Sequence, residues 1–465
     1  MNLLKIIIMK SVLFFLTALA LVSCENTDPS ETVTKKKSDG VQHPTWSEQA
    51  VIYEVNIRQH TPEGTFKAFQ EKLPEIKELG AKILWIMPVQ PIGEKNRKGG
   101  LGSYYSIKDY TAVNPEFGTL EDFRALVDTA HAMGFKILLD WVGNHSAWDN
   151  VWIEKHPDWY THDREGNIVP PVEDWSDVAD LNYDNKELRV AMQEAMKWWV
   201  TETDIDGYRC DVAYMVPMDF WNQTRKILDS IKPVFMLAEA EGPDFHKYAF
   251  DMTYGWELHH LMNKIAKGEA PVDTLEDYSA KSDTLYSASA LRMYFTSNHD
   301  ENSWNGTVYE RMGVNHKNFF VLSATLENGM PLIYGGQEWG LSKSLSFFEK
   351  DTINGSDTAL FNFYKSIVTL KNTHPALHNG EDQGVMQQLH SQVPSVYAFK
   401  RIKNGRELFV AINFDREEVT FPVEGLSSEG SWSDALTGSE MKKPADNNLK
   451  IPANDYLLID ITTKE

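Results

Sequence analysis

Four apolar runs of this sequence end on acidic residues, and this pattern constrains the fold more than any other feature. Residues 136–140, 205–211, 234–239 and 293–300 each lead from hydrophobic side chains to a carboxylate. Short apolar runs separated by helix-forming segments are typical of buried parallel strands. In a barrel of eight parallel strands, the carboxyl ends of all strands lie on one side. We therefore expect the four acids to meet at one pocket.

The second run ends with a cation and a carboxylate two residues apart. Arg209 and Asp211 share one face of the expected strand because side chains alternate across it, whereas Cys210 faces away as a small buried hydrophobe. The arginine is expected to keep the aspartate ionised, as a nucleophile requires. This stretch alone favours a structural Arg–Asp pair, but the repetition of the pattern at other strand ends favours catalysis.

Motifs at these ends resemble the signature regions of the α-amylase superfamily of glycoside hydrolases, in the order that the family has them. They are residues 140–145 (DWVGNH), 207–211 (GYRCD), 239 (E) and 298–300 (NHD), with 178–182 (VADLN) similar to a fifth region. The resemblance extends from about residue 50 to the C-terminus. It implies an α/β fold, a TIM (β/α)₈ barrel with a small B-domain insertion after strand 3 and a C-terminal all-β sandwich domain.

The resemblance also assigns roles to single residues. Asp211 is the expected nucleophile, Glu239 the general acid with a raised pKa, and Asp300 the third acid that binds sugar hydroxyls. The other expected contacts with the sugar or with the network below it are Tyr105, His145, Arg209, His299 and Asp140. Glu241 is a competing acid, but Glu239 directly follows its apolar run.

A structural calcium ion is a further expectation from the resemblance. Asn144 and Asp180 match two of the family's oxygen ligands. Starch-degrading members often carry Lys-His after the nucleophile, where this chain has Tyr214 and Met215. That departure weakens the calcium prediction and leaves the usual sugar contact on the leaving-group side in doubt.

The chain is expected to divide into a signal peptide, a tether and two folded domains. The basic and apolar start, followed by Leu-Val-Ser-Cys, resembles a bacterial lipoprotein signal in which Cys24 is lipidated, with an ordinary signal peptide as the alternative. The expected parts are the signal peptide 1–23, a disordered tether 24–44, the barrel 45–375 with the B domain 144–182, and the C-terminal β-sandwich 376–465.

The composition of the chain limits the classes of molecule that it is expected to bind. The chain has 45 basic and 67 acidic residues, a net charge of −22, which disfavours nucleic acid as a partner. Its 14 Trp, 18 Tyr and 22 Phe are expected mostly in the core, with a minority in a sugar cleft. Candidates for that cleft within the insertion are Trp148, Trp152, Trp159 and Trp175. The Gly- and Lys-rich loop 93–103 is expected to shape the rim of the cleft.

The resemblance implies a retaining α-glucan hydrolase that cleaves α-1,4 bonds in starch or maltodextrins through a covalent glycosyl-enzyme intermediate. A cyclodextrin or maltodextrin hydrolase, or a glucanotransferase with the same triad, is the first alternative. An inactive glucan-binding lipoprotein is the second. The protein is expected to be exported and held in a membrane by its lipid, in the periplasm or at the cell surface.

Overall fold

The structure, a computed structural model, describes residues 40–422, 425–427 and 430–462. The predictions for residues 1–39, including lipidation of Cys24, lie outside the described residues. Within the described part of the chain, no helix is both long enough and apolar enough to cross a membrane.

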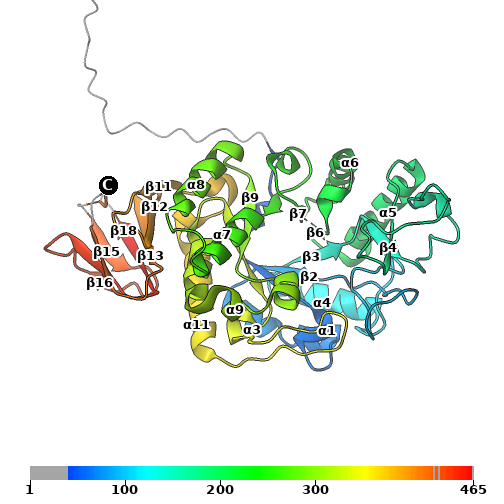
Figure 1. Cartoon of the computed structure of the whole chain (residues 1–465), viewed down its shortest axis with the longest axis horizontal. Coiled ribbons are helices and arrows are strands. Elements are labelled where there is room, and N and C mark those ends of the chain that lie inside the picture. The colour runs from blue at the N-terminus through cyan, green and yellow to red at the C-terminus, as the bar shows by residue number, and fades with distance from the viewer. Residues whose placement is uncertain (1–39, 423–424, 428–429, 463–465) are drawn as a thin grey trace, which may run out of the picture. The chain divides into compact units, whose positions relative to one another are not determined.

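Eight parallel strands close into a barrel in the order β1-β10-β9-β8-β7-β6-β3-β2 (Figure 1). The strands are β1 Ile52–Val55, β2 Ile83–Ile86, β3 Lys136–Trp141, β6 Gly207–Cys210, β7 Phe235–Ala238, β8 Met252–Tyr254, β9 Leu291–Phe295 and β10 Gly329–Tyr334. Asp140 of β3 pairs with Arg209 of β6, which pairs with Leu237 of β7. This register brings the carboxyl ends of the three strands to one level, and the predicted barrel is confirmed.

The barrel interior is filled by side chains that face inward from the strands. The interior cluster is fully buried and consists of Ala50, Ile52, Ile83, Trp85, Leu138, Phe235, Leu237, Met252, Tyr254, Leu291, Met293, Phe295, Met330 and Leu332. The strand residues between them face outward and pack against the helices, and Cys210 belongs to this outer layer as a buried free thiol. Burial on both faces explains why the strands appear in the sequence as continuous apolar runs.

Helices follow most barrel strands and cover the outside of the barrel (Figure 1). They are α1 Ile57–His60, α2 Phe66–Gln70, α3 Leu73–Leu79, α4 Leu120–Ala132, α5 Lys186–Thr203, α6 Met218–Asp229, α7 Trp256–Ala266, α8 Thr274–Leu285, α9 Val308–Met312, α10 His316–Thr325 and α11 Thr358–Thr373. Residues 66–79 are divided into two short helices, α2 and α3, with Pro74 in the first turn of α3, where the missing N–H is tolerated. Helix α8 is anchored on one face by its buried residues Leu275 and Tyr278.

The insertion after the third barrel strand is small. It contains an antiparallel pair, β4 His145–Ala147 and β5 Val178–Asp180, in which His145 lies opposite Asp180. A short 3₁₀ helix, Pro157–Trp159, lies between these strands in the sequence. The insertion therefore begins and ends at the mouth of β3, beside the expected pocket.

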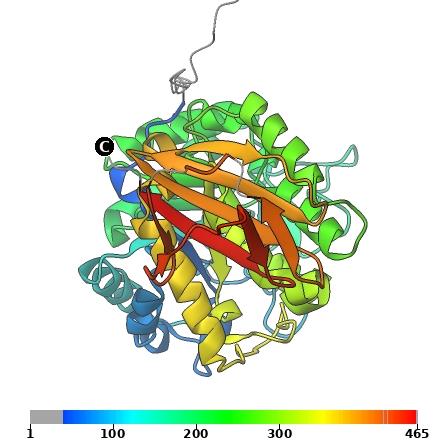
Figure 2. The same cartoon turned by 90° about the vertical axis from the view of Figure 1, so that its left-hand side faces the viewer.

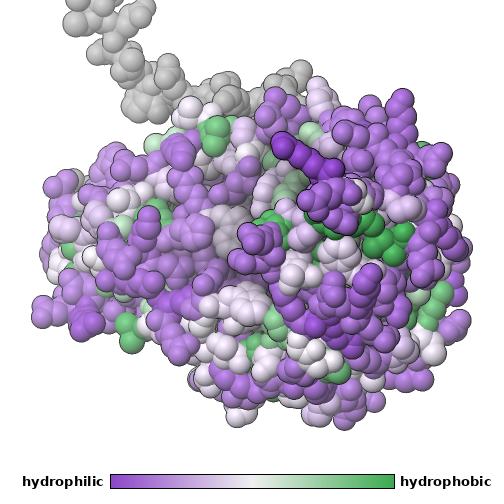
Figure 3. All heavy atoms as spheres, turned by 45° about the vertical axis from the view of Figure 1, so that its right-hand side comes forward, coloured by the Kyte–Doolittle hydropathy of each residue, from purple (hydrophilic) through white to green (hydrophobic). Residues whose placement is uncertain are grey.

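The C-terminal part is all β, as expected (Figure 2). A six-stranded sheet has the order β11-β12-β13-β18-β15-β16, and a two-stranded sheet joins β14 and β17. The strands are β11 Val385–Leu389, β12 Val396–Lys403, β13 Arg406–Asn413, β14 Val419–Pro422, β15 Ser431–Asp434, β16 Glu440–Met441, β17 Asn448–Ile451 and β18 Tyr456–Thr462. Apolar residues of both sheets, such as Phe409 and Phe421, form one buried cluster. The face of the molecule in Figure 3 is largely hydrophilic, with apolar residues in scattered patches.

Candidate active site

A buried arginine lies at the centre of the candidate site. Arg209 has no exposed surface, and its Nη1 donates to Asp140 Oδ1 at 2.8 Å and to Asp211 Oδ1 at 3.1 Å. Its Nη2 lies 3.0 Å from Glu239 Oε2, and its Nε donates to the Tyr254 hydroxyl at 3.1 Å. One cation thus holds three carboxylates from neighbouring strands, which compensates the large penalty for burying a charge.

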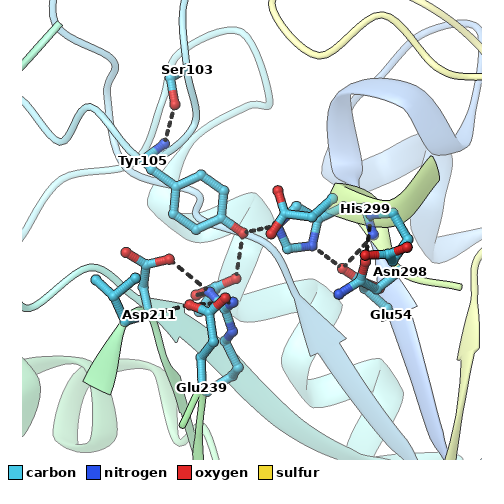
Figure 4. A network of polar contacts seen from close by, with 12 residues as sticks. Glu54, Ser103, Tyr105, Asp211, Glu239, Asn298 and His299 are labelled. Atoms are coloured by element: carbon cyan, nitrogen blue, oxygen red, sulfur yellow. Dashed lines mark hydrogen bonds and ion pairs between the residues drawn. The ribbon is translucent and has the colours of Figure 1, made fainter. Parts of the chain in front are cut away.

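The three predicted catalytic acids face one cavity. Asp211, Glu239 and Asp300 follow β6, β7 and β9, and all three line a cavity of about 300 Å³. Figure 4 shows the side chains of Asp211 and Glu239 directed toward the same region. Asp211 and Glu239 are nearly buried, with side chains 11% and 12% exposed, whereas Asp300 is 37% exposed. The structure therefore brings together the acids that the motifs predicted.

Val212, directly after Asp211, has a strained backbone. Its φ of 35° and ψ of 46° lie in the left-handed region, which a β-branched residue rarely adopts. This conformation directs the Val212 N–H to Glu239 Oε2, which accepts a hydrogen bond at 2.7 Å. The turn after the expected nucleophile therefore also positions the expected acid.

Burial and mutual repulsion set the protonation of the two buried acids. Burial raises the pKa of both Asp211 and Glu239; the Glu239 charge raises that of Asp211 further, and Asp300 raises that of Glu239. Arg209 opposes both shifts. The pair therefore takes up its first proton at a higher pH than isolated carboxyl groups do. The expectation that the arginine keeps Asp211 ionised is incomplete, because burial and Glu239 act against it.

Tyr105 and His299 form a connected pair (Figure 4). Their rings stack with centroids 5.5 Å apart, and the Tyr105 hydroxyl lies 2.8 Å from His299 Nε2. On its other side, His299 Nδ1 lies 2.5 Å from Glu54 Oε1. Burial lowers the pKa of His299, but Asp300 and Glu54 together raise it to about 9. The protonated imidazole donates from both nitrogens, so the Tyr105 hydroxyl is free to donate to Asp140 Oδ2 at 3.0 Å.

His145 is the second histidine of the cavity and, unlike His299, is neutral. Burial lowers its pKa to about 3, so the ring is neutral at neutral pH. Its Nε2 lies 4.0 Å from Asp211 Oδ2, and its ring meets the Trp175 ring edge-on at 5.5 Å. Of the expected substrate contacts, Tyr105, His145 and His299 line the cavity. Asp140 and Arg209 lie beneath it and hold the acids.

The competing acid Glu241 lies outside the cavity. It forms an ion pair with Arg292 and accepts a hydrogen bond from the Glu257 N–H at 3.2 Å. These contacts hold its carboxylate away from Asp211, so Glu239 is the acid that shares the cavity with the expected nucleophile.

The two expected calcium ligands lie in neighbouring backbone segments. The Asn144 carbonyl accepts from the Leu181 N–H at 3.1 Å, and Asp180 directly precedes Leu181. Burial raises the pKa of Asp180, as expected for a carboxylate without a strong cationic neighbour. Among the described residues, no group of three or more His, Cys, Asp and Glu side chains forms a metal site. Two side-chain oxygens fit Ca²⁺ only if backbone carbonyls complete the shell, so calcium stays a prediction.

Several residues of the site escaped the sequence analysis. Glu54, which holds His299, also comes from an apolar strand, so the signal was present but not used. Trp304, Phe347 and Phe348 line the cavity from segments after β9 and β10 that carry no periodic pattern. The expected rim loop 93–103 does contribute to the lining, through Lys98 and Ser103.

The four candidate tryptophans of the insertion have different positions. Trp175 lines the cavity. Trp159 is buried in the core, and Trp152 stacks on Tyr110 at 4.7 Å. Trp148 donates from Nε1 to the Ser176 carbonyl at 2.9 Å and does not line the cavity. Of the four tryptophans, Trp175 alone therefore belongs to the wall of the cavity.

Comparisons with known proteins show what the chain as a whole is similar to. Residues 23–175 and 159–359 match the family described as "Alpha amylase, catalytic domain". An alpha-amylase from Lactobacillus plantarum is 31% identical, with a TM-score of 0.80 over 90% of this chain and 100% of that chain. A maltogenic alpha-amylase from Thermotoga neapolitana is 29% identical, with a TM-score of 0.82 over 90% and 100%. An alpha-amylase from Haloarcula japonica is 26% identical over 88% of this chain, which spans only 62% of that relative's length.

Proposed function

The chain belongs to the alpha-amylase family of glycoside hydrolases, and from that premise we propose that it cleaves α-1,4 bonds of starch or maltodextrins with retention of the anomeric configuration. The observation that carries the proposal is the shared cavity of Asp211, Glu239 and Asp300 above Arg209. A retaining glycosidase needs one carboxylate as nucleophile and one carboxylic acid beside it. A buried pair that shares one proton supplies both.

Arg209 contacts the two acids differently. The contact of Arg209 Nη1 with Asp211 is a hydrogen bond, whereas its Nη2 lies within ion-pair distance of Glu239 without a hydrogen bond. A hydrogen bond to the charged form favours that form. The reaction requires the proton on Glu239 and the negative charge on Asp211. The Arg209 hydrogen bond favours this arrangement, whereas burial, which raises the pKa of Asp211 well above its ordinary value, and the Val212 N–H bond to Glu239 oppose it.

The reaction follows in two steps. Glu239 donates its proton to the glycosidic oxygen while an Asp211 oxygen attacks the anomeric carbon, and the bond to the leaving sugar breaks. The Glu239 carboxylate then takes a proton from water, and the resulting hydroxyl displaces Asp211 from the anomeric carbon. Two inversions give retention, and Glu239 ends protonated again.

The other cavity residues hold the sugar during these steps. Tyr105 presents a ring that His299 fixes from behind, as a platform for the sugar at the cleavage position. The half-exposed Asp300 carboxylate offers an acceptor to its hydroxyls, and the protonated His299 holds the Tyr105 hydroxyl in place. Such contacts strengthen as the ring flattens toward the oxocarbenium-like transition state.

Product analysis on soluble starch, pullulan and cyclodextrin tests the activity, and NMR of the first products tests the stereochemistry. We expect maltodextrin products that appear first as the α-anomer; β-anomers as first products would reject a covalent intermediate on Asp211. A glucanotransferase with the same triad is distinguished in the same assay, because it would yield products longer than the substrate supplied.

We also propose that Asn144 and Asp180 supply two ligands of a structural Ca²⁺, completed by backbone carbonyls. Thermal unfolding with and without a chelator tests this. Chelation is expected to lower the Tm of the wild type and of the exposed control variant Asp163→Asn, but not that of Asp180→Asn. Equal Tm values with and without the chelator in the wild type would reject the site.

Finally, we propose export as a lipoprotein, supported by the apolar start and the cysteine that follows it. The full-length chain is expected in the membrane fraction with a labelled lipid on Cys24. A Cys24→Ala variant that stayed in the membrane fraction would refute the anchor.

A further inference from the structure

The cavity wall is built by three segments from one arc of the barrel. They are the loop 93–103 after β2, the π-helical segment Glu301–Asn305 after β9, and the loop 341–357 after β10. The side chains that these segments place on the cavity include Lys98, Trp304, Phe347 and Phe348. None of these four side chains carries out a step of the proposed reaction. Their arrangement therefore needs an explanation other than the chemical step.

Lys98 connects this wall to the insertion after β3. Its Nζ lies 3.2 Å from Asp177 Oδ1 and donates to the Asp174 carbonyl at 2.5 Å. Both Lys98 and Asp177 line the cavity, and Asp177 is only 8% exposed at its side chain. The ion pair therefore spans the cleft between the loop 93–103 and the insertion.

The same loop is joined to the loop after β10. The Leu101 N–H donates to the Phe348 carbonyl at 3.0 Å, and the Gly100 N–H donates to Glu349 Oε1 at 2.5 Å. Gly99, with φ of 65°, lets the backbones approach, because a Cβ there would lie 2.4 Å from Phe348 Cβ. These contacts close the wall between β2 and β10.

The segment after β9 completes the wall. Asn302 donates to the Lys343 carbonyl at 3.1 Å and accepts from the Leu345 N–H at 2.8 Å. The Trp304 ring lies 5.2 Å from the Phe347 ring, and it is 57% exposed although it lines the cavity. An indole face held at a cavity rim suits stacking on a further sugar ring.

The opposite side of the barrel carries none of the wall segments described above. In the barrel order, the wall arises after β9, β10 and β2 and continues through the insertion after β3, which leaves the side of β6 to β8. Glu239 follows β7 there, and Tyr214, which lies after β6, is 64% exposed. Because Glu239 protonates the leaving oxygen in the proposed reaction, the leaving sugar lies toward the side of β6 to β8 and the retained sugar points at the wall.

We propose, on the basis of the proposed function, that this wall makes the enzyme act from the non-reducing chain end. The glucan enters with its end sugar against Lys98, Trp304 and Phe348, and a chain cannot continue past them. The cavity volume of about 300 Å³ lies at the lower end of small-ligand pockets and leaves room for about two sugar rings on the retained side. The released product is therefore short, and internal bonds of long chains are poor sites of attack.

Two maltoheptaosides test the wall, one free and one carrying a 4,6-acetal on its non-reducing end sugar. Chromatography of the products gives the two hydrolysis rates. The wild type is expected to cleave the blocked substrate at least about 100-fold more slowly, since the acetal displaces the chain from the acid. Similar rates on both substrates would overturn the inference. Hydrolysis of neither substrate would instead reject the proposed function itself.

Variants locate the effect in the wall. Lys98→Ala combined with Trp304→Ala is expected to accelerate cleavage of the blocked substrate about tenfold or more, while changing the free substrate less. Lys95→Ala is the matched control, because it removes a lysine of the same loop that does not line the cavity. If the double variant does not fold, the single variant Trp304→Ala, which changes an exposed side chain, is measured in its place. An unchanged ratio of blocked to free rates in folded wall variants would refute the assignment to these residues.

Discussion

The replacement Glu54→Gln tests whether His299 works as a cation that Glu54 holds in place. Glu54 is fully buried on β1, and its Oε1 lies 2.5 Å from His299 Nδ1. Glutamine keeps the size and one acceptor oxygen but removes the charge. The pKa of His299 therefore falls from about 9 toward its ordinary value of 6.5.

The size of the effect follows from the charge that the contact between residue 54 and His299 loses. A hydrogen bond to a charged group is worth about 1.5–3 kcal/mol, and about 1.4 kcal/mol corresponds to a factor of ten. We therefore expect kcat/KM on maltoheptaose to fall about 10- to 100-fold at neutral pH. The raised pKa keeps His299 charged below about 9, so in the variant the charge is lost at lower pH.

The assay combines kcat/KM across pH with NMR titration of the histidine ring. Glu338→Gln is the matched control: this glutamate is also buried, burial raises its pKa to about 7, and it accepts from the Tyr53 hydroxyl at 2.7 Å. It does not line the cavity. The control is expected to lower Tm without changing the pH profile. If Glu54→Gln kept wild-type kcat/KM and an unchanged His299 pKa, the reasoning would fail.

The remaining predictions concern the acids. Glu239→Gln should slow maltooligosaccharides by about 10²- to 10⁴-fold but maltosyl fluoride far less, because fluoride leaves without a proton; Glu241→Gln should behave like the wild type in both assays, and the reverse pattern would exchange their roles. Asp300→Asn should move the alkaline limb of the kcat/KM profile to lower pH, because the Asp300 charge raises the pKa of Glu239; a limb that stayed in place would show that another group sets it. Asp211→Asn should abolish turnover at an unchanged Tm, and substantial retained activity would remove it as nucleophile.

The positions of the three acids at the rim of the barrel could be predicted from the sequence, because they follow from the geometry of the strand backbone. Asp211, Glu239 and Asp300 come directly after apolar strands, and parallel strands of a closed barrel present such residues at one end. The strand period also placed Cys210 away from the cavity, in the outer layer. Most helices were predictable for the same reason, since their buried faces recur at helical spacing.

The closed side of the cleft was predictable only as a loop of suitable composition. Lys98 reaches Asp177 across more than 70 positions of sequence, and Phe348 meets Leu101 across an even greater separation. Contacts between irregular segments depend on tertiary packing, which leaves no local period to recognise. Helix α8 also has a weak sequence pattern, because Leu275 and Tyr278 are its only buried residues and the rest is largely polar.

The measurement that tests the mechanism most directly is the identity of the residue that carries the glycosyl group. A fluorinated α-maltosyl fluoride, which slows the second step, is incubated with the enzyme, and the digested protein is analysed by mass spectrometry. The mechanism predicts one sugar adduct, on the peptide that contains Asp211. An adduct on Glu239 or Asp300, or turnover without any adduct and with inverted products, would contradict it.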